Sequence, residues 1–150
     1  NAVSQNPEVL LEAKAPVILT PHPGEMARLV PNIRIQNNRI PVAQETAQNY
    51  NSFIALKGVR TIVSSPDGNV FINPTGNPGM ATAGTGDVLT GIIAGLVAQN
   101  IIPVEAAKAG VFLHGVAGDL VAQAKGEYGL LAGDLIDAIP DAVKFIQEYR

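Results

Sequence analysis

A glycine-rich turn, Gly84-Thr85-Gly86-Asp87, carries the residues best placed for chemistry. It stands directly before an apolar pattern of helical spacing, and glycines at a helix start let the backbone approach a ligand closely. The free amides of a first helical turn, aided by the helix dipole, attract anions, so Gly84, Thr85 and Gly86 form a predicted anion hole for a phosphate. Asp87 could accept a proton from a hydroxyl that is being phosphorylated. The alternative is a small-residue turn in which the acid stabilises the helix dipole.

The second candidate is the loop 20–25, with the sequence TPHPGE. Prolines on both sides restrict the backbone of His22. The loop follows the carboxyl end of a predicted strand, which is where open α/β sheets bind ligands. His22 could therefore hydrogen-bond a polar ligand. An ordinary strand-to-helix turn, in which Glu25 stabilises the helix start, fits the same residues.

The third candidate is the segment 57–61, which comprises Lys57, Gly58, Val59, Arg60 and Thr61. A lysine at the carboxyl end of an apolar strand can meet a phosphate, the glycine leaves space for it, and Thr61 adds a hydroxyl. The alternative is a solvated strand end, which is common for lysine.

The other ionisable residues have structural explanations. His114 and Asp119 lie on an apolar helix rich in small residues, where we expect a packed, hydrogen-bonded histidine rather than a catalytic one. The small residues indicate close helix packing, either within the core or across a subunit boundary. Asp134, Asp137 and Asp141 are expected as helix-surface acids, since no histidine nearby suggests a metal cluster.

Helices and strands alternate in the first half of the chain, and helices dominate the second half. Strands are expected at 16–20, 53–57, 61–64 and 70–73, the last two as an antiparallel hairpin. Helices are expected at 7–15, 25–29, 42–50, 88–97, 103–124 and beyond residue 133, where Pro140 should kink or divide the last one. This order predicts the α/β class, with a mostly parallel sheet covered by helices.

Composition excludes several classes of function. The 150 residues, 47% hydrophobic and 15% charged with a mean hydropathy of +0.20, indicate one globular domain. A net charge of -3 without a basic cluster argues against nucleic-acid binding. The absence of cysteine excludes disulfides, thiol catalysis and cysteine-bound zinc, and fits the cytoplasm. The most apolar stretch, 88–104, is interrupted by polar residues and proline, so no membrane span is expected.

Taken together and in this order, the motifs resemble those of the ADP- or ATP-dependent NAD(P)H-hydrate dehydratases, which belong to the ribokinase-like superfamily. The resemblance covers essentially the whole chain. It is carried by LTPHPGEMARL at 19–29, LKG at 56–58, GNPGMATAGTGDVLTGIIAGLVAQ at 76–99 and FLHGVAGD at 112–119.

The resemblance implies a metabolite-repair reaction. Hydrated NADH or NADPH carries a ring hydroxyl, which the family phosphorylates with ADP or ATP before phosphate leaves and the double bond returns. Asp87 matches the catalytic aspartate and substrate contact, and His22 matches a second substrate contact. Mg2+ is expected with the donor phosphates, without a residue that identifies its ligands. The segment that lines the adenine nucleotide is matched by Lys57, Gly58, Val59, Arg60 and Thr61, with Gly86 beside it.

The amino end departs from the family pattern. Asn1 matches the last residue of the family's D-A-D-A-L-N pattern, so residues 1–150 are expected to be the C-terminal portion of one larger domain, which lacks its N-terminal segment. The family often forms homotetramers. Two alternatives remain: a vitamin or sugar kinase of the same superfamily, and an inactive nucleotide-binding fragment.

Overall fold

The computed structural model describes residues 2–31 and 38–148, so Asn1 lies outside the described residues. Within them four strands form one sheet in the order β1-β2-β3-β4. The α/β class is confirmed. The strands are β1 (Ile18–Leu19), β2 (Phe53–Leu56), β3 (Ile62–Ser64) and β4 (Val70–Ile72).

The sheet is mixed, whereas a mostly parallel sheet was predicted. β1 pairs with β2 in parallel, and β2 with β3 and β3 with β4 are antiparallel. The turns 57–61 and 65–69 are too short for the crossover that a parallel pair needs. The β1–β2 connection has that length and contains α1 (Pro23–Leu29) and α2 (Arg39–Asn49).

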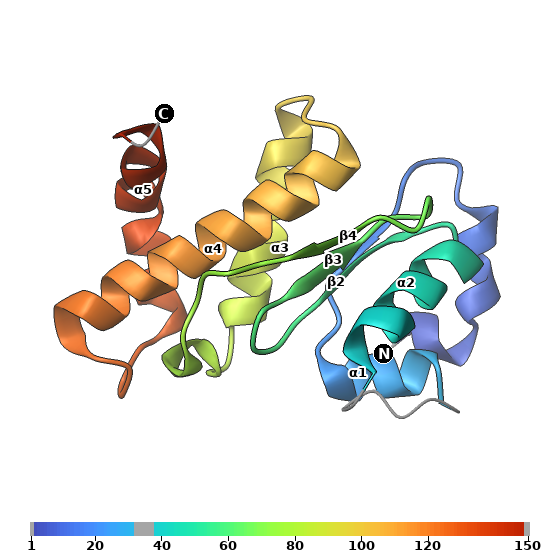
Figure 1. Ribbon diagram of the computed structural model, residues 1–150, viewed down its shortest axis with the longest axis horizontal. Helices are drawn as coiled ribbons and strands as arrows, with labels where there is room; N and C mark the ends of the chain where they lie inside the picture. The colour runs from blue at the N-terminus through green and yellow to red at the C-terminus, as the bar shows by residue number, and fades with distance from the viewer. Residues whose placement is uncertain (1, 32–37, 149–150) are drawn as a thin grey trace.

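The two faces of the sheet bury different side chains because successive residues of a strand point to opposite sides. Ile54, Leu56 and Ile62 pack in one cluster with residues of α1 and α2. Ala55 and Val63 pack on the other face with α3 (Thr85–Ala98) and α4 (Pro103–Lys125). Figure 1 shows the sheet between these two pairs of helices.

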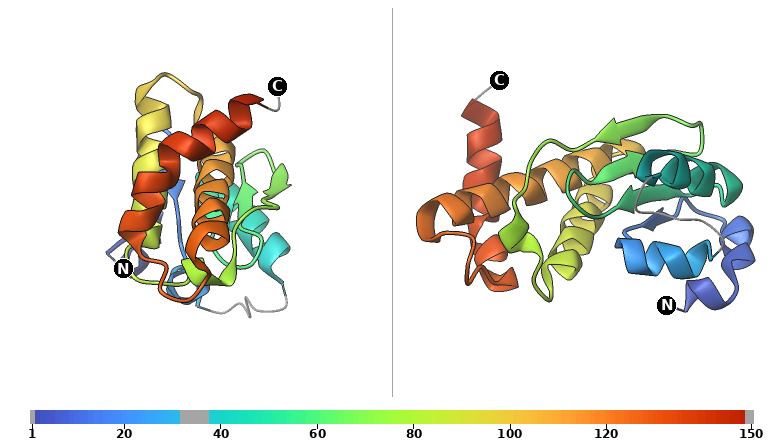
Figure 2. Two further views of the ribbon diagram at one scale, coloured as in Figure 1. Left: turned by 90° about the vertical axis from the view of Figure 1, so that its left-hand side faces the viewer. Right: turned by 60° about the horizontal axis from the view of Figure 1, so that its bottom comes forward.

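The last helix, α5 (Ala132–Glu148), packs on α4 and α3 and buries Leu135 and Ala142. Figure 2 shows it across these helices, away from the sheet. The predicted division at Pro140 does not occur, because α5 continues through this residue as one helix. Buried contacts on both sides of the proline offset its missing hydrogen bond. Within the two described ranges, no helix is long and apolar enough to cross a bilayer.

The helix predicted at 7–15 is a shorter 3-10 helix, η2 (Pro7–Glu12), which a 3-10 turn, η1 (Val3–Gln5), precedes. Asn6 is its N-cap residue, but the Asn6 side chain makes no cap hydrogen bond. Leu10 is the buried residue of η2, whereas Val9 and Leu11 are exposed. A short helix with so little buried surface is marginal, which explains the tighter turn.

The small residues of α4 serve contacts within the chain. A Cβ atom on Gly115 would lie 2.0 Å from the Thr75 hydroxyl oxygen, and one on Gly118 would lie 2.3 Å from the Met80 sulfur. Both glycines therefore let the loop 73–84, with its 3-10 turn η3 (Pro78–Met80), lie directly on α4.

Candidate functional site

A cavity of about 680 Å³ lies between the carboxyl ends of β1 and β2 and the start of α3. It brings together three segments that are far apart in the sequence. The residues singled out above that line it are His22, Lys57, Gly58, Val59, Arg60, Thr61, Gly84, Thr85, Gly86 and Asp87.

The parallel pairing of β1 and β2 explains this convergence. Parallel strands end at the same edge of a sheet, so the loops that follow them start side by side. The pairing continues beyond the strands, since the Lys57 N–H donates a hydrogen bond of 2.8 Å to the Pro21 carbonyl. The loop 20–25 and the turn 57–61 therefore form one wall of the cavity.

His22 begins α1 as its N-cap. Its Nδ1 accepts hydrogen bonds from the Gly24 N–H at 3.0 Å and the Glu25 N–H at 3.2 Å. In return, Glu25 Oε2 accepts from the His22 N–H at 2.7 Å, which completes a capping box. Since Nδ1 is an acceptor, the neutral ring carries its proton on Nε2. His22 can therefore offer an N–H to a ligand while it caps its own helix.

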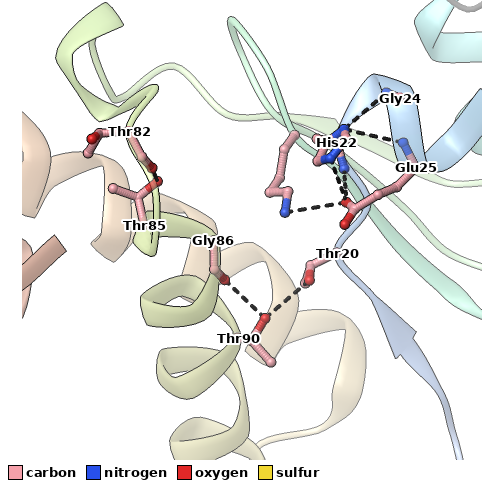
Figure 3. A network of polar contacts seen from close by, with 9 residues as sticks. Thr20, His22, Gly24, Glu25, Thr82, Thr85, Gly86 and Thr90 are labelled. Atoms are coloured by element: carbon pink, nitrogen blue, oxygen red, sulfur yellow. Dashed lines mark hydrogen bonds and ion pairs between the residues drawn. The ribbon is translucent and has the colours of Figure 1, made fainter. Parts of the chain in front are cut away.

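Lys57 links this loop to α3. Its Nζ lies 3.7 Å from Glu25 Oε2, and a Cβ atom on Gly86 would lie 2.8 Å from the same nitrogen. Burial alone would raise the pKa of Glu25. The hydrogen bond from the His22 N–H and the positive charge of Lys57 outweigh that effect and hold the pKa of Glu25 below its ordinary value. Figure 3 shows the loop of His22 and Glu25 facing the first turns of α3 at Gly86 and Thr90.

The start of α3 has no side-chain cap. Its N-cap is Gly84, with a φ of +87°, a conformation that favours glycine. The Thr85 hydroxyl oxygen lies 2.8 Å from the Met80 carbonyl and 2.9 Å from the Thr82 carbonyl, so its single O–H is shared by these two acceptors. The Asp87 N–H donates to the Gly84 carbonyl at 3.1 Å, so the N–H groups of Thr85 and Gly86, which come before the first intrahelical bond, are the donors available to an anion. Asp87 is exposed in the same turn and lines the cavity.

The turn 57–61 is held from behind by Arg39, which sequence reasoning missed. The Arg39 guanidinium donates to four main-chain carbonyls of this region, at distances between 2.6 and 3.4 Å. Arg39 is a single arginine after a polar stretch and belongs to no motif, so nothing in the sequence indicated its contact with the turn. Gly58 and Arg60 have φ angles of +135° and +56°, and Val59 is 85% exposed.

The loop 73–84 and α4 supply the rest of the cavity wall, including Asn73, Asn77 and Met80. Asn73 is buried, and its Nδ2 donates to the carbonyls of Thr75 and Val111. This loop lies between the predicted strand 70–73 and the predicted helix 88–97, and Gly84 is the one of its residues that the sequence assigned to the site. The many asparagine, proline and glycine residues of this loop are the sequence feature that could have indicated its place in the site.

His114 is a packed, hydrogen-bonded histidine, as predicted, although it also lines the cavity. Its Nε2 lies 2.9 Å from the Thr85 carbonyl, so this nitrogen is the donor. Burial lowers the pKa of His114; the bond to Thr85 opposes this effect, and the nearby charge of Lys57 adds to it. The structural interpretation of Asp119 also holds, since its carboxylate accepts from the Gly76 N–H and the Asn77 Nδ2.

The cavity has few side chains that could bind a metal ion. The described part of the chain contains no group of three or more His, Cys, Asp or Glu side chains able to hold a metal ion. Mg2+ is often bound by one or two carboxylates together with substrate phosphates and water. The cavity offers Asp87 for such a shared site, so it fits a magnesium ion held mainly by nucleotide phosphates.

Three comparisons with known proteins agree. A family model described as NAD(P)H-hydrate dehydratase matches residues 1–141. The bifunctional NAD(P)H-hydrate repair enzyme Nnr of Moorella thermoacetica is 49% identical over 150 residues, which cover 99% of this chain and 28% of that protein. The ADP/ATP-dependent NAD(P)H-hydrate dehydratase from Bacillus subtilis, co-crystallised with ATP/Mg2+, has a TM-score of 0.83 at 40% identity, over 86% of this chain and 47% of that one.

A ribokinase-like superfamily protein from Enterococcus faecalis has a TM-score of 0.77 at 37% identity, over 95% of this chain and 48% of that one. The predicted ribokinase-like fold is thereby confirmed. The chain spans about half the length of these two structures and less than a third of the Moorella enzyme. With the family model matching nearly all of its residues, the chain belongs to the NAD(P)H-hydrate dehydratase family.

Proposed function

We propose that this chain is the C-terminal portion of one ribokinase-like domain that converts hydrated NADH or NADPH back to NADH or NADPH with ADP or ATP. The observation that carries the proposal is the cavity in which the His22 loop, the turn 57–61 and the start of α3 meet. These segments supply a polar contact, a cation and free helix amides around one carboxylate. Membership of the family supports the same reaction.

The reaction divides the cavity into an acceptor side and a donor side. The ring hydroxyl of the hydrated dinucleotide attacks the terminal phosphorus of the nucleotide as Asp87 accepts its proton. The new P–O bond forms while the bond to the leaving ADP or AMP breaks. Phosphate then leaves with the electrons of the C–O bond, and loss of a proton from the neighbouring carbon restores the ring double bond.

The residues of this chain would stabilise the charge that moves between these groups. The Lys57 ammonium and the amides of Thr85 and Gly86 would contact the transferring phosphoryl group, because charge develops on its oxygens. His22 would donate from Nε2 to the hydrated dinucleotide. The segment 57–61 would line the adenine nucleotide. Bound Mg2+ would neutralise phosphate charge.

Assembly and location belong to the same proposal. We expect the longer protein to supply the N-terminal segment of the domain. We also expect it to form a homo-oligomer, as a tetramer like members of the family, and to work in the cytoplasm. The absence of cysteine fits a reducing compartment. Size-exclusion chromatography with light scattering checks the tetramer.

The test is an assay of the intact protein with hydrated NADH or NADPH and either ADP or ATP. Recovery of the dihydronicotinamide absorbance is expected with one donor, and the comparison of the two identifies that donor. If the absorbance does not recover with ADP or with ATP, and the protein phosphorylates a hydroxymethylpyrimidine or thiazole instead, the protein is a vitamin kinase and the proposal is wrong. If the 150-residue chain alone binds nucleotide without turnover, the missing segment is required for catalysis.

A further inference from the structure

Arg39, the first residue of α2, holds the turn 57–61 by its carbonyl groups. Its Nη1 donates to the Val59 carbonyl at 2.6 Å. Its Nη2 lies 3.2 Å from the Leu56 carbonyl, 3.3 Å from that of Lys57 and 3.4 Å from that of Arg60. One guanidinium thus contacts four carbonyls across the whole turn.

Arg39 acts from the side of the turn that faces away from the cavity. It lines a separate shallow hollow of about 360 Å³ with Asn38, Ile40 and Pro41, and it is not among the residues that line the large cavity. Val59 and Arg60 line both spaces. The turn is therefore a thin wall with Arg39 on one side and the candidate site on the other.

The conformation of the turn needs such a support. Gly58 has a φ of +135°, and Arg60 has a φ of +56°, which L-residues other than glycine seldom adopt. A Cβ atom on Gly58 would lie 3.0 Å from Arg39 Nη2, so the absence of a side chain lets the guanidinium approach this closely. The hydrogen bonds of Arg39 thus stabilise a backbone that would otherwise relax.

The charge of Arg39 is costly to place there. Burial lowers its pKa, its Nε is buried without a hydrogen-bond partner, and no carboxylate among the described residues pairs with it. Four carbonyl dipoles balance the charge instead. The planar guanidinium can reach all four at once, which a lysine ammonium cannot do from the same position.

We propose that Arg39 is a positioning residue for the nucleotide, which holds the turn 57–61 so that Lys57 and the amides of the turn meet the phosphates. The proposal rests on the proposed function in one respect, namely that the ligand of this turn is ADP or ATP. Because Arg39 lies behind the turn, its loss should weaken nucleotide binding and leave the hydrated dinucleotide largely unaffected.

The experiment uses the intact protein with Arg39→Ala, Arg39→Lys and, as a matched control for loss of an exposed cation, Lys144→Ala. Affinity for ADP and ATP is measured by calorimetry, the KM of each substrate by the repair assay, and exchange of the amides of residues 57–61 by hydrogen–deuterium exchange. Arg39→Ala should raise the nucleotide Kd about 10- to 100-fold, since displaced positioning groups have effects of this size. Exchange should rise in the same turn.

Added guanidinium ion should restore part of the nucleotide affinity of Arg39→Ala, and Arg39→Lys should lie between the wild type and Arg39→Ala. Equal losses for both substrates, or a nucleotide Kd within twofold of the wild type in a folded variant, would overturn the proposal. If Arg39→Ala does not fold, Arg39→Lys decides by the same criteria. A wild type that binds nucleotide without repair activity would refute the proposed function and leave the role of Arg39 testable by binding.

Discussion

Two helices begin at the cavity, and they satisfy their first turns in opposite ways. The start of α1 is closed by its own side chains, since His22 and Glu25 form a reciprocal capping box. The start of α3 has Gly84 at the N-cap and no side-chain cap. The amides of α1 are therefore occupied within the chain, whereas those of α3 can serve a ligand.

This difference separates the chemistry of the two sides. In the proposed function, a ligand at α1 would meet a side chain, the Nε2 edge of His22, whose orientation the cap fixes. A ligand at α3 would meet the backbone, with the carboxylate of Asp87 beside it. A polar ring suits the first side and a phosphate suits the second. Substitutions at the two helix starts test this division.

Asp87→Asn in the intact protein removes the proposed proton acceptor from the open helix start. We expect kcat for repair to fall about 10²- to 10⁴-fold, because general-base catalysis contributes effects of this size. Nucleotide affinity should change little, since the amides remain. The rate of NADH recovery measures the effect, with Asp137→Asn as the control on an exposed acid. Repair at the wild-type rate would remove Asp87 from the mechanism.

Gly86→Ala changes the open helix start without adding backbone strain. The new methyl group would lie 2.8 Å from Lys57 Nζ, the far end of a flexible side chain, so the ammonium should be displaced while the fold persists. We expect nucleotide Kd to rise about 10-fold, as for loss of one charge-assisted hydrogen bond. Gly91→Ala is the matched control, because a Cβ atom there meets nothing within 4 Å. Equal effects of the two variants would contradict the placement of Lys57.

His22→Ala opens the closed helix start, and His22→Asn separates the two roles of the histidine. Loss of the cap should cost about 1 kcal/mol of unfolding free energy, and asparagine should recover most of it as a good N-cap. Both variants lack the ring Nε2, so both should raise KM for hydrated NADH. Thermal unfolding and steady-state kinetics measure the two effects. Normal KM in His22→Asn would mean that the cap alone matters.

His114 supports the open helix start through the Thr85 carbonyl, and its effect should depend on pH. Because burial lowers the pKa of His114 in the folded state, its stabilising effect is complete above the unfolded pKa near about 6.5. It is lost as the pH falls below that value, since the unfolded chain binds the proton more readily. Tm measured from about pH 8 to about pH 5.5 should fall more for the wild type than for His114→Gln. Parallel curves would contradict this assignment.

Local patterns predicted most of the elements, and the family resemblance implied that the three segments share one site. The spacing of Val88, Leu89, Ile92 and Ile93 placed α3, and the apolar runs placed all four strands within a few residues. The rule that ligands bind at the carboxyl ends of strands singled out the His22 loop, and Lys57 was placed at the end of another predicted strand. These features depend on residues that are close in sequence or on a general rule of topology.

The errors concern interactions between distant residues. The segment predicted as a helix at 7–15 forms only the 3-10 helix 7–12, because Val9 and Leu11 find no packing surface. The continuity of α5 depends on contacts on both sides of Pro140. The contact of Arg39 with the turn 57–61 joins residues about twenty positions apart and has no sequence motif. Such contacts follow from the assembled fold, which a single sequence does not reveal.

The hydrogen bond between the Lys57 N–H and the Pro21 carbonyl gives the acceptor and donor segments a shared main-chain anchor. A ligand that moves either segment must carry the other with it or break this bond. If nucleotide and dinucleotide bind to these two segments as proposed, the shared bond would couple their affinities. The factor by which bound nucleotide changes the affinity for dinucleotide would then equal the factor by which bound dinucleotide changes the affinity for nucleotide, whichever binds first.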